Sequence, residues 1–138
     1  MKQDFHTVII RTDGARLYEF TDAAAAFIAK SGIADGLLTC FIRHTSASLL
    51  IQENADPNVQ KDLIAAFARL APEDFPYHHD EEGPDDMPSH IKSALTAVSL
   101  GVPVRGGKLA LGAWQGLYLF EHRHAAHRRE VLLHIIGE

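Results

Sequence analysis

The stretch GLLTCFIRHTSASLLIQE (residues 36–53) gives the strongest indication of the fold. Its two β-rich halves are separated only by Thr45 and Ser46, and such a short link predicts two strands joined as an antiparallel hairpin. Side chains alternate between the two faces of a strand, so Cys40 and His44 share one largely apolar face. His44 therefore leaves the first strand at the mouth of the hairpin. The hydroxyl groups beside it either serve a site or bond the local backbone of the turn.

The rest of the chain continues this pattern of short strands with few helices. Turn residues at 12–14 predict a second hairpin near the N-terminus, and Asp56 followed by Pro57 predicts the start of a helix. Residues 71–88 carry four prolines and no periodicity, which is typical of a long functional or disordered loop. The elements expected outside residues 36–53 are strands at 5–11, 15–20, 102–104, 108–112, 114–122 and 129–137, and helices at 22–31, 57–70 and 89–100.

These elements predict the fold class. We expect residues 1–138 to form one compact α+β domain, a mostly antiparallel sheet or sandwich with about three helices. The chain has 13 basic and 18 acidic residues, a net charge of −5, which gives no support to a role on nucleic acid or at a membrane surface. Cys40 is the one cysteine, so no internal disulfide forms, and its apolar strand indicates a core residue. Without a signal-peptide pattern or an apolar run of about 20 residues, we expect a cytoplasmic protein that does not enter the membrane.

The segment HHDEEGPDDMPSH (residues 78–90) concentrates groups that bind metals. It holds three histidines, five carboxylates and neither lysine nor arginine. Imidazole and carboxylate are the usual ligands of Zn, Mn, Fe and Ni, so the segment is a candidate metal site. The alternative is a solvated acidic loop whose carboxylates favour the N-terminus of a helix that begins at Ser89.

Two further segments carry polar groups among apolar ones. In WQGLYLFEH (residues 114–122), Gln115 shares a strand face with Leu117 and Leu119. A buried amide needs partners, so Gln115 is a candidate for positioning a ligand, although a core strand explains most of this segment. In EHRHAAHRR (residues 121–129), the pattern favours a surface turn rich in histidine. The alternative is that Arg123, Arg128 or Arg129 binds phosphate, whose oxygens match a guanidinium group.

Three motifs together resemble a known family. HTSASLLIQENADP (44–57), HHDEEGPDDMPSHIKSAL (78–95) and LALGAWQGLYLFEHR (109–123) are similar to the YjbQ family, also called the UPF0047 or secondary thiamine-phosphate synthase family. The resemblance implies a compact α+β domain that assembles as a homotrimer. It also implies weak thiamine-phosphate synthase activity in some members. Ala113 stands where the family usually has threonine.

The resemblance also implies a set of site residues, and the simplest explanation of three separated polar motifs is that they converge on one pocket. His44, His79 and His90 are the expected ligands of a divalent metal, most simply Zn²⁺, because three imidazoles leave an open coordination position. The expected catalytic residues are Asp86, Glu53 and Gln115. The expected substrate-binding residues are Thr45, Ser46, Asn54, Trp114 and Arg123.

Two functions follow from this assignment. The first is a metal-dependent enzyme for a phosphorylated or heterocyclic small molecule, which includes joining a pyrimidine pyrophosphate to a thiazole phosphate. A histidine-rich site differs, however, from the oxygen-rich Mg²⁺ sites usual in pyrophosphate chemistry. The alternative is a trimeric protein that binds a metal or small ligand without turnover, because no residue of the sequence is unmistakably a nucleophile.

Overall fold

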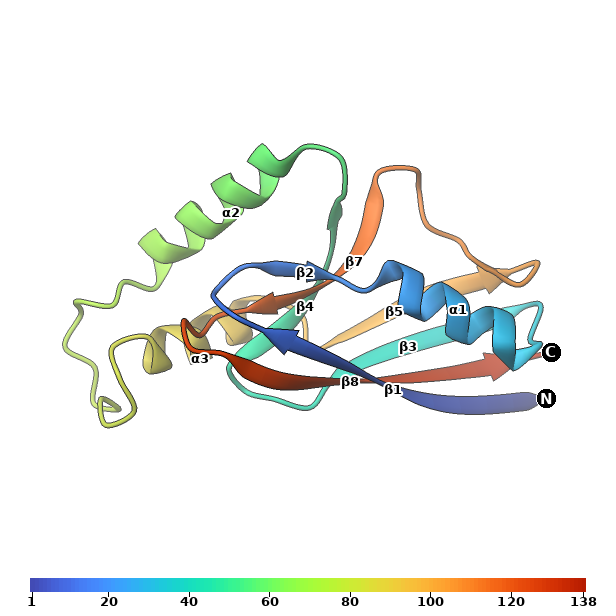
Figure 1. The fold of residues 1–138 in the computed structure, drawn as a ribbon, viewed down its shortest axis with the longest axis horizontal. Helices are drawn as coiled ribbons and strands as arrows, with labels where there is room; N and C mark the ends of the chain where they lie inside the picture. The colour runs from blue at the N-terminus through green and yellow to red at the C-terminus, as the bar shows by residue number, and fades with distance from the viewer.

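The computed structural model describes residues 1–138 and consists of two antiparallel sheets packed face to face (Figure 1). The five-stranded sheet has the order β1 (Lys2–Thr12), β8 (His127–Gly137), β3 (Gly36–Ile42), β5 (Ser99–Arg105), β6 (Lys108–Leu109). The three-stranded sheet has the order β2 (Leu17–Glu19), β7 (Gln115–Glu121), β4 (Ala47–Glu53). The helices are α1 (Thr21–Ser31), α2 (Pro57–Leu70) and α3 (Asp86–Leu95). The predicted α+β class with three helices is confirmed.

The core lies between the two sheets and is built from one face of each. The predicted alternation along β3 is confirmed, because Leu38, Cys40 and Ile42 are at most 2% exposed. Burial raises the pKa of the Cys40 thiol to about 12, which suits a core residue. Facing residues of the other sheet include Leu49, Leu117 and Leu119, and helix α1 closes one end of the core with Ala24, Phe27 and Ile28.

Both predicted hairpins are wrong. Strand β3 pairs with β5 and β8, whereas β4 pairs with β7 in the other sheet. Strand β1 likewise pairs with β8, and β2 pairs with β7. Each short connection therefore carries the chain across the sandwich from one sheet to the other. The physical reason is burial of apolar surface. Strands in opposite sheets pack their apolar faces against each other, whereas neighbouring strands in one sheet lie side by side and do not cover each other's faces.

Helix α3 begins and ends earlier than the sequence pattern predicts. Asp85 is its N-cap residue and Asp86 its first residue, so Ser89 is not the cap. Pro88 is tolerated because it lies in the first turn, where backbone N–H groups have no partner within the helix. The predicted last residues of the helix instead belong to β5, which starts at Ser99. As a result, His90 lies one helical turn after Asp86.

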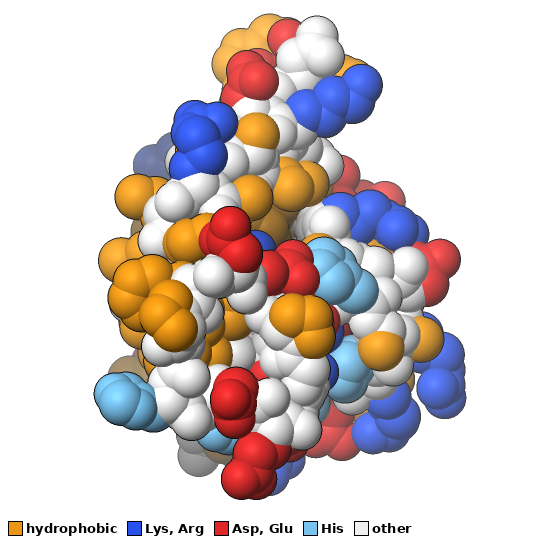
Figure 2. Space-filling model, turned by 90° about the vertical axis from the view of Figure 1, so that its left-hand side faces the viewer, with side chains coloured by type: hydrophobic (Ala, Val, Ile, Leu, Met, Phe, Trp, Pro, Cys, Tyr) orange, Lys and Arg blue, Asp and Glu red, His pale blue; other side chains and the backbone are white.

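Helices α2 and α3 and the loop between them gather at the end of the molecule opposite the two chain termini (Figure 1). The predicted helix start is confirmed, because the Asp56 side chain accepts a hydrogen bond from Asn58 N. Helix α2 packs Phe67 edge-on against Phe120 of β7, yet it has no fully buried side chain. Figure 2 looks at this end and shows histidine side chains beside acidic ones, with hydrophobic side chains close by.

The outer face of the five-stranded sheet stays apolar and exposed. Its large side chains Phe5, Leu37, Phe41 and Ile136 are between 36% and 58% exposed. None of the three helices combines the length and the apolarity that crossing a membrane requires.

Candidate metal centre

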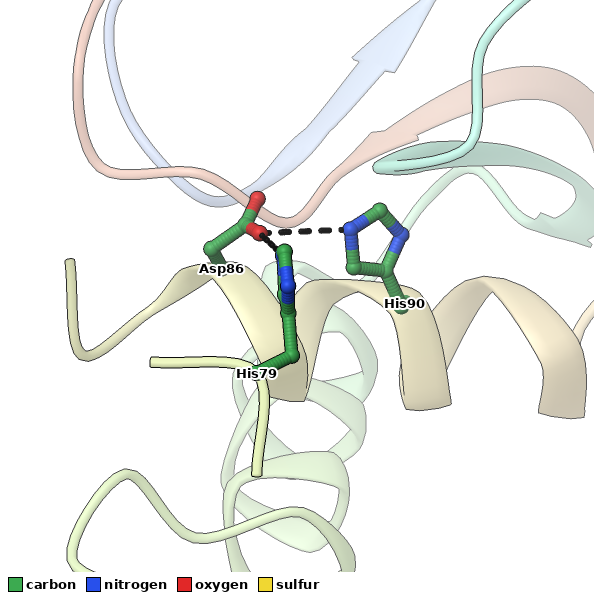
Figure 3. Close-up of side chains that lie close together, drawn as sticks. All are labelled: His79, Asp86 and His90. Carbon is green, nitrogen blue, oxygen red and sulfur yellow. Dashed lines mark hydrogen bonds and ion pairs between the residues drawn. The ribbon is translucent and has the colours of Figure 1, made fainter. Parts of the chain in front are cut away.

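The centre of the candidate site is one turn of helix α3 and the loop before it. Asp86 and His90 stand four residues apart and therefore lie on the same face of the helix. His79 comes from the preceding loop and points at the same carboxylate (Figure 3). The His79 Nε2 atom lies 2.6 Å from Asp86 Oδ2, and the His90 Nε2 atom lies 3.3 Å from that same oxygen. His78, its neighbour, lies outside this cluster.

Arg123 holds the acidic loop against the end of strand β7. Its guanidinium group donates from Nη1 to Asp86 Oδ1 at 2.6 Å and from Nε to Asp85 Oδ2 at 3.1 Å. A third bond joins Nη2 to the carbonyl oxygen of Glu82 at 2.9 Å. Because all three donating nitrogens already have protein partners, Arg123 positions the loop in this structure. Its expected role in binding phosphate stays a prediction.

The orientation of His90 is fixed from its other side. The Nδ1 atom of His90 lies 2.9 Å from the carbonyl oxygen of Thr45. A carbonyl only accepts, so Nδ1 must carry the hydrogen, and Nε2 of the neutral ring keeps its lone pair. Metal-binding histidines commonly show this arrangement, with the outer nitrogen held by a carbonyl or a carboxylate.

Electrostatics favour an ionised Asp86. Its side chain is only 5% exposed, and burial alone would raise the pKa of the carboxyl group. The hydrogen bond from His79 and the charges of His90 and Arg123 outweigh burial and hold the pKa of Asp86 below its usual value. The hydrogen bond to Asp86 in turn raises the pKa of His79. The cluster therefore attracts positive charge, either a proton or a cation.

The donor set fits a divalent metal. One ligand atom from each of His79, Asp86 and His90 lies within 4.8 Å of the other two. Two imidazoles and one carboxylate are ligands of Zn²⁺ and of non-haem Fe²⁺, and three protein ligands leave room for a water or a substrate.

Two pockets border the cluster, and each shares one histidine with it. The first, with a volume of about 250 Å³, is polar at His44, Thr45 and Ser93 and is bounded by His90. The second, of about 440 Å³, is mostly aromatic and apolar and is bounded by His79. We call the second the aromatic pocket; its lining residues are Phe75, Pro76, Tyr77, His78, His79 and Met87.

His44 does not join the cluster. Its Nε2 atom accepts a hydrogen bond from the backbone N–H of Glu130 at 2.8 Å, so that lone pair is already used. Burial and then the charge of Arg129 lower the pKa of His44, which keeps the ring neutral. The structure thus groups two of the three predicted imidazoles with Asp86 and places His44 in the polar pocket beside them.

Four predicted site residues lie at the far end of the three-stranded sheet. Glu53 ends strand β4, whose seven residues separate it from Ser46 by roughly 20 Å. Glu53 Oε2 accepts from Asp56 N at 2.7 Å, Asn54 Nδ2 donates to Gln115 O at 3.5 Å, and Gln115 Oε1 accepts from Gly112 N at 2.8 Å. Trp114 is 66% exposed. The expectation that all three motifs converge on one pocket is therefore wrong for a single chain.

A buried ion pair between Arg129 and Glu121 was not predicted from the sequence. Arg129 Nε donates to Glu121 Oε1 at 2.7 Å, Thr12 donates to the same oxygen, and the Arg129 side chain also bonds Ser46 Oγ at 3.0 Å. This pair anchors the segment that carries His44 and Thr45. The sequence did contain an indication of this pair. Glu121 shares one strand face with Leu117 and Leu119, and a charge buried on such a face needs a partner.

His122 is also buried, so the predicted surface turn begins only after it. Its Nε2 atom bonds Ser48 Oγ at 2.9 Å, and Nδ1 has no partner. Burial, followed by the charge of Lys92, lowers the pKa of His122 to about 3. The imidazole is therefore a neutral core group.

Comparisons with known proteins agree on one family. The family model described as "UPF0047 protein YjbQ-like" matches residues 6–138. The UPF0047 protein sll1880 of Synechocystis is 51% identical over 138 residues, which cover 99% of this chain and 94% of that protein. The UPF0047 protein YjbQ of Escherichia coli O157:H7 is 47% identical over 75% of each chain.

Solved structures show the same fold. A protein of the yjbq/upf0047 family from Clostridium acetobutylicum, described as uncharacterised, aligns with a TM-score of 0.85 at 31% identity and covers 96% of this chain and 99% of its own. A YbjQ-like protein of unknown function from Sulfolobus solfataricus aligns with a TM-score of 0.87 at 24% identity, over 99% of this chain and all of its own, and supports the fold alone.

Proposed function

The chain belongs to the YjbQ-like UPF0047 family, and we propose that it is a metal-dependent enzyme that acts on a small molecule at the cluster of His79, Asp86 and His90. The observation that carries the proposal is the convergence of two imidazole Nε2 atoms on one buried carboxylate oxygen. When His90 is neutral, its bond to the Thr45 carbonyl leaves the lone pair on Nε2, which repels the Asp86 carboxylate unless a cation or proton lies between them. We propose Zn²⁺ as that cation, because the donors are nitrogen and oxygen and few in number.

The polar pocket supports binding of a ligand oxygen next to His90. The Nε2 atom of His44 is committed to the backbone, so its Nδ1 atom carries the hydrogen and is free to donate. Ser93 contributes a buried hydroxyl group that has no hydrogen-bond partner. A bound metal would supply Lewis acidity, while His44, Thr45 and Ser93 would orient the oxygen of the substrate.

Thiamine-phosphate synthase activity is a narrower proposal and is supported only by the family resemblance. Transfer between phosphorylated substrates needs cationic groups that are free to neutralise phosphate. Arg123 is the nearest guanidinium group to the cluster, and its donors hold Asp85, Asp86 and Glu82. We therefore propose this reaction as a side activity rather than the principal one.

We also propose a homotrimer. The exposed apolar side chains on the outer face of the five-stranded sheet, and a helix α2 without any fully buried side chain, support association between copies. Light scattering at micromolar concentration should give about three times the chain mass of 15.2 kDa. A monomer mass would contradict the proposed trimer and leave the metal proposal standing.

Elemental analysis and zinc titration test the metal centre. The wild type should bind one zinc ion per chain, and His79→Ala and His90→Ala should each lose at least about 10-fold in affinity. His134→Ala is the matched control, because that partly exposed histidine lies on strand β8, hydrogen-bonds only Gln3 and stacks on Phe5. Equal zinc content in all four proteins would contradict the proposal.

Turnover separates an enzyme from the alternative, a binding protein without catalysis. The zinc-loaded protein is incubated with a panel of phosphorylated and heterocyclic small molecules, including the pyrimidine pyrophosphate and thiazole phosphate pair, and products are followed by mass spectrometry. An enzyme should form a product that Asp86→Ala abolishes while the variant keeps its fold. Zinc binding without any product would favour the binding protein, which the absence of a nucleophile in the cluster supports.

A further inference from the structure

We propose that the small molecule bound at the metal centre carries an aromatic ring and that the aromatic pocket is the subsite for this ring. The inference rests on the proposed function and deepens it, because it names a substrate class. The pocket is wide enough for a single ring system, with a volume of about 440 Å³. Its walls are largely apolar, supplied by Phe75, Pro76, Tyr77 and Met87.

The pocket borders the cluster. His79 lines the pocket and also lies 2.6 Å from Asp86, so one imidazole borders both. Met87, another wall residue, directly follows Asp86 on helix α3. A ligand bound at the cluster would therefore lie next to this wall.

The aromatic walls are held in place before any ligand arrives. Tyr77 donates from its hydroxyl group to Pro72 O at 2.7 Å, and its backbone N–H bonds Phe75 O at 2.9 Å. The rings of Phe75 and Tyr77 pack with centroids 5.0 Å apart. A preorganised wall loses little entropy on binding, which favours affinity.

Phe75 supplies exposed aromatic surface to this wall. It is 58% exposed, although large aromatic side chains are usually well buried. A flat ring seated beside it would remove this surface from water and stack on Phe75 and Tyr77. The Met87 thioether adds a favourable contact between sulfur and an aromatic edge.

The two pockets differ in chemistry, and the difference orients the ligand. The pocket on the His90 side offers hydrogen-bond donors, including the unpartnered hydroxyl of Ser93. The pocket on the His79 side offers apolar surface. The substrate class is thus a planar ring that bears an oxygen ligand for the metal, with its polar part on the His90 side.

A matched pair of probes tests the subsite without requiring turnover. Acetohydroxamate and benzohydroxamate share one metal-chelating group, and only the second carries a ring. Calorimetric titration of the zinc-loaded wild type should show benzohydroxamate binding roughly 10- to 100-fold more tightly, as expected for burial of a phenyl group. Phe75→Ala and Met87→Ala should reduce this preference several-fold and leave the affinity for acetohydroxamate unchanged.

Phe5→Ala is the matched control, because Phe5 is also 58% exposed but lies on strand β1. It should keep the full preference for the ring. Equal affinities of the two hydroxamates for the wild type would overturn the subsite and leave the metal centre intact. If neither probe binds the zinc-loaded protein, no coordination position is open, and both proposals fail. If Phe75→Ala changes the sedimentation mass and keeps the ring preference, Phe75 is covered by another copy of the chain and the subsite is wrong.

Discussion

The two ends of the three-stranded sheet use similar residue types in different ways. At the helix α3 end, His79, Asp86 and His90 direct their side-chain atoms at one another. At the opposite end, Glu53 and Gln115 use their side-chain oxygens to bond nearby backbone N–H groups. Polar side chains that satisfy local backbone stabilise a turn, whereas those that converge on each other create a site that attracts a cation. The partners of the polar atoms, rather than the residue types, distinguish the two ends.

The largest effect is expected at the buried ion pair that supports the α3 end. Glu121→Ala leaves Arg129 buried without its partner and should lower the free energy of unfolding by about 3–5 kcal/mol. Urea denaturation followed by circular dichroism measures this change. Glu130→Ala is the control, because Glu130 pairs with Arg43 and Arg128 in half-exposed contacts and should cost about 1 kcal/mol or less. Equal losses would mean that the ion pair does not support the fold as described.

Asp86→Asn compares the two ends most directly. It should lower zinc affinity by at least about 10- to 100-fold, because it removes the charge on which both imidazoles converge. Glu53→Gln, the equivalent change at the other end, should leave zinc affinity unchanged. Isothermal titration of both variants decides the comparison. A similar loss in both would show that the two ends act as one site, which in a structure of this shape requires a second copy of the chain.

The far end should respond in stability rather than in binding. Gln115→Ala removes the bond to Gly112 N and should lower the free energy of unfolding by roughly 0.5–1.5 kcal/mol. The same variant should keep the zinc and benzohydroxamate affinities of the wild type. Loss of ligand binding at unchanged stability would instead assign Gln115 a ligand.

The smallest effect is the pH dependence of His79. Its pKa is raised in the folded, metal-free protein, mainly by the hydrogen bond to Asp86. The contribution of this pair to stability is therefore complete below about pH 6.5, the unfolded pKa of histidine, and is lost as pH rises through the raised pKa. Thermal unfolding in chelator should show the wild type more stable than His79→Gln at pH 6, with the difference disappearing toward pH 8.5. Zinc displaces the same proton, so its affinity should rise over that interval.

Asp86 does not titrate in this interval, because its pKa is lowered and its charge is already complete at pH 6. His134→Gln serves as the control for a surface histidine. A stability difference between wild type and His79→Gln that grows with pH would contradict the assigned pair.

Several features followed from local patterns and were predictable. The period of two along β3 identified its buried face, and the sequence Asp56-Pro57 identified the start of helix α2. The density of histidine and acid at residues 78–90 identified the loop that carries the cluster. The start of helix α3 was missed because proline at position 88 suggests a break, whereas a first turn tolerates it. Because the helix starts about one turn earlier than predicted, Asp86 belongs to it and lies on the same helix face as His90.

Periodicity and composition within short windows were enough to predict the α+β class, the inward strand faces and the loop richest in metal-binding groups. Long-range packing set the path of the short links at 13–16 and 43–46, which cross between the sheets instead of closing hairpins. Long-range packing also paired Arg123 with Asp86 and Arg129 with Glu121, and it left Glu53 roughly 20 Å along strand β4 from Ser46. These are contacts between residues far apart in the chain, and they form because burying two apolar faces together aligns strands that no local pattern relates.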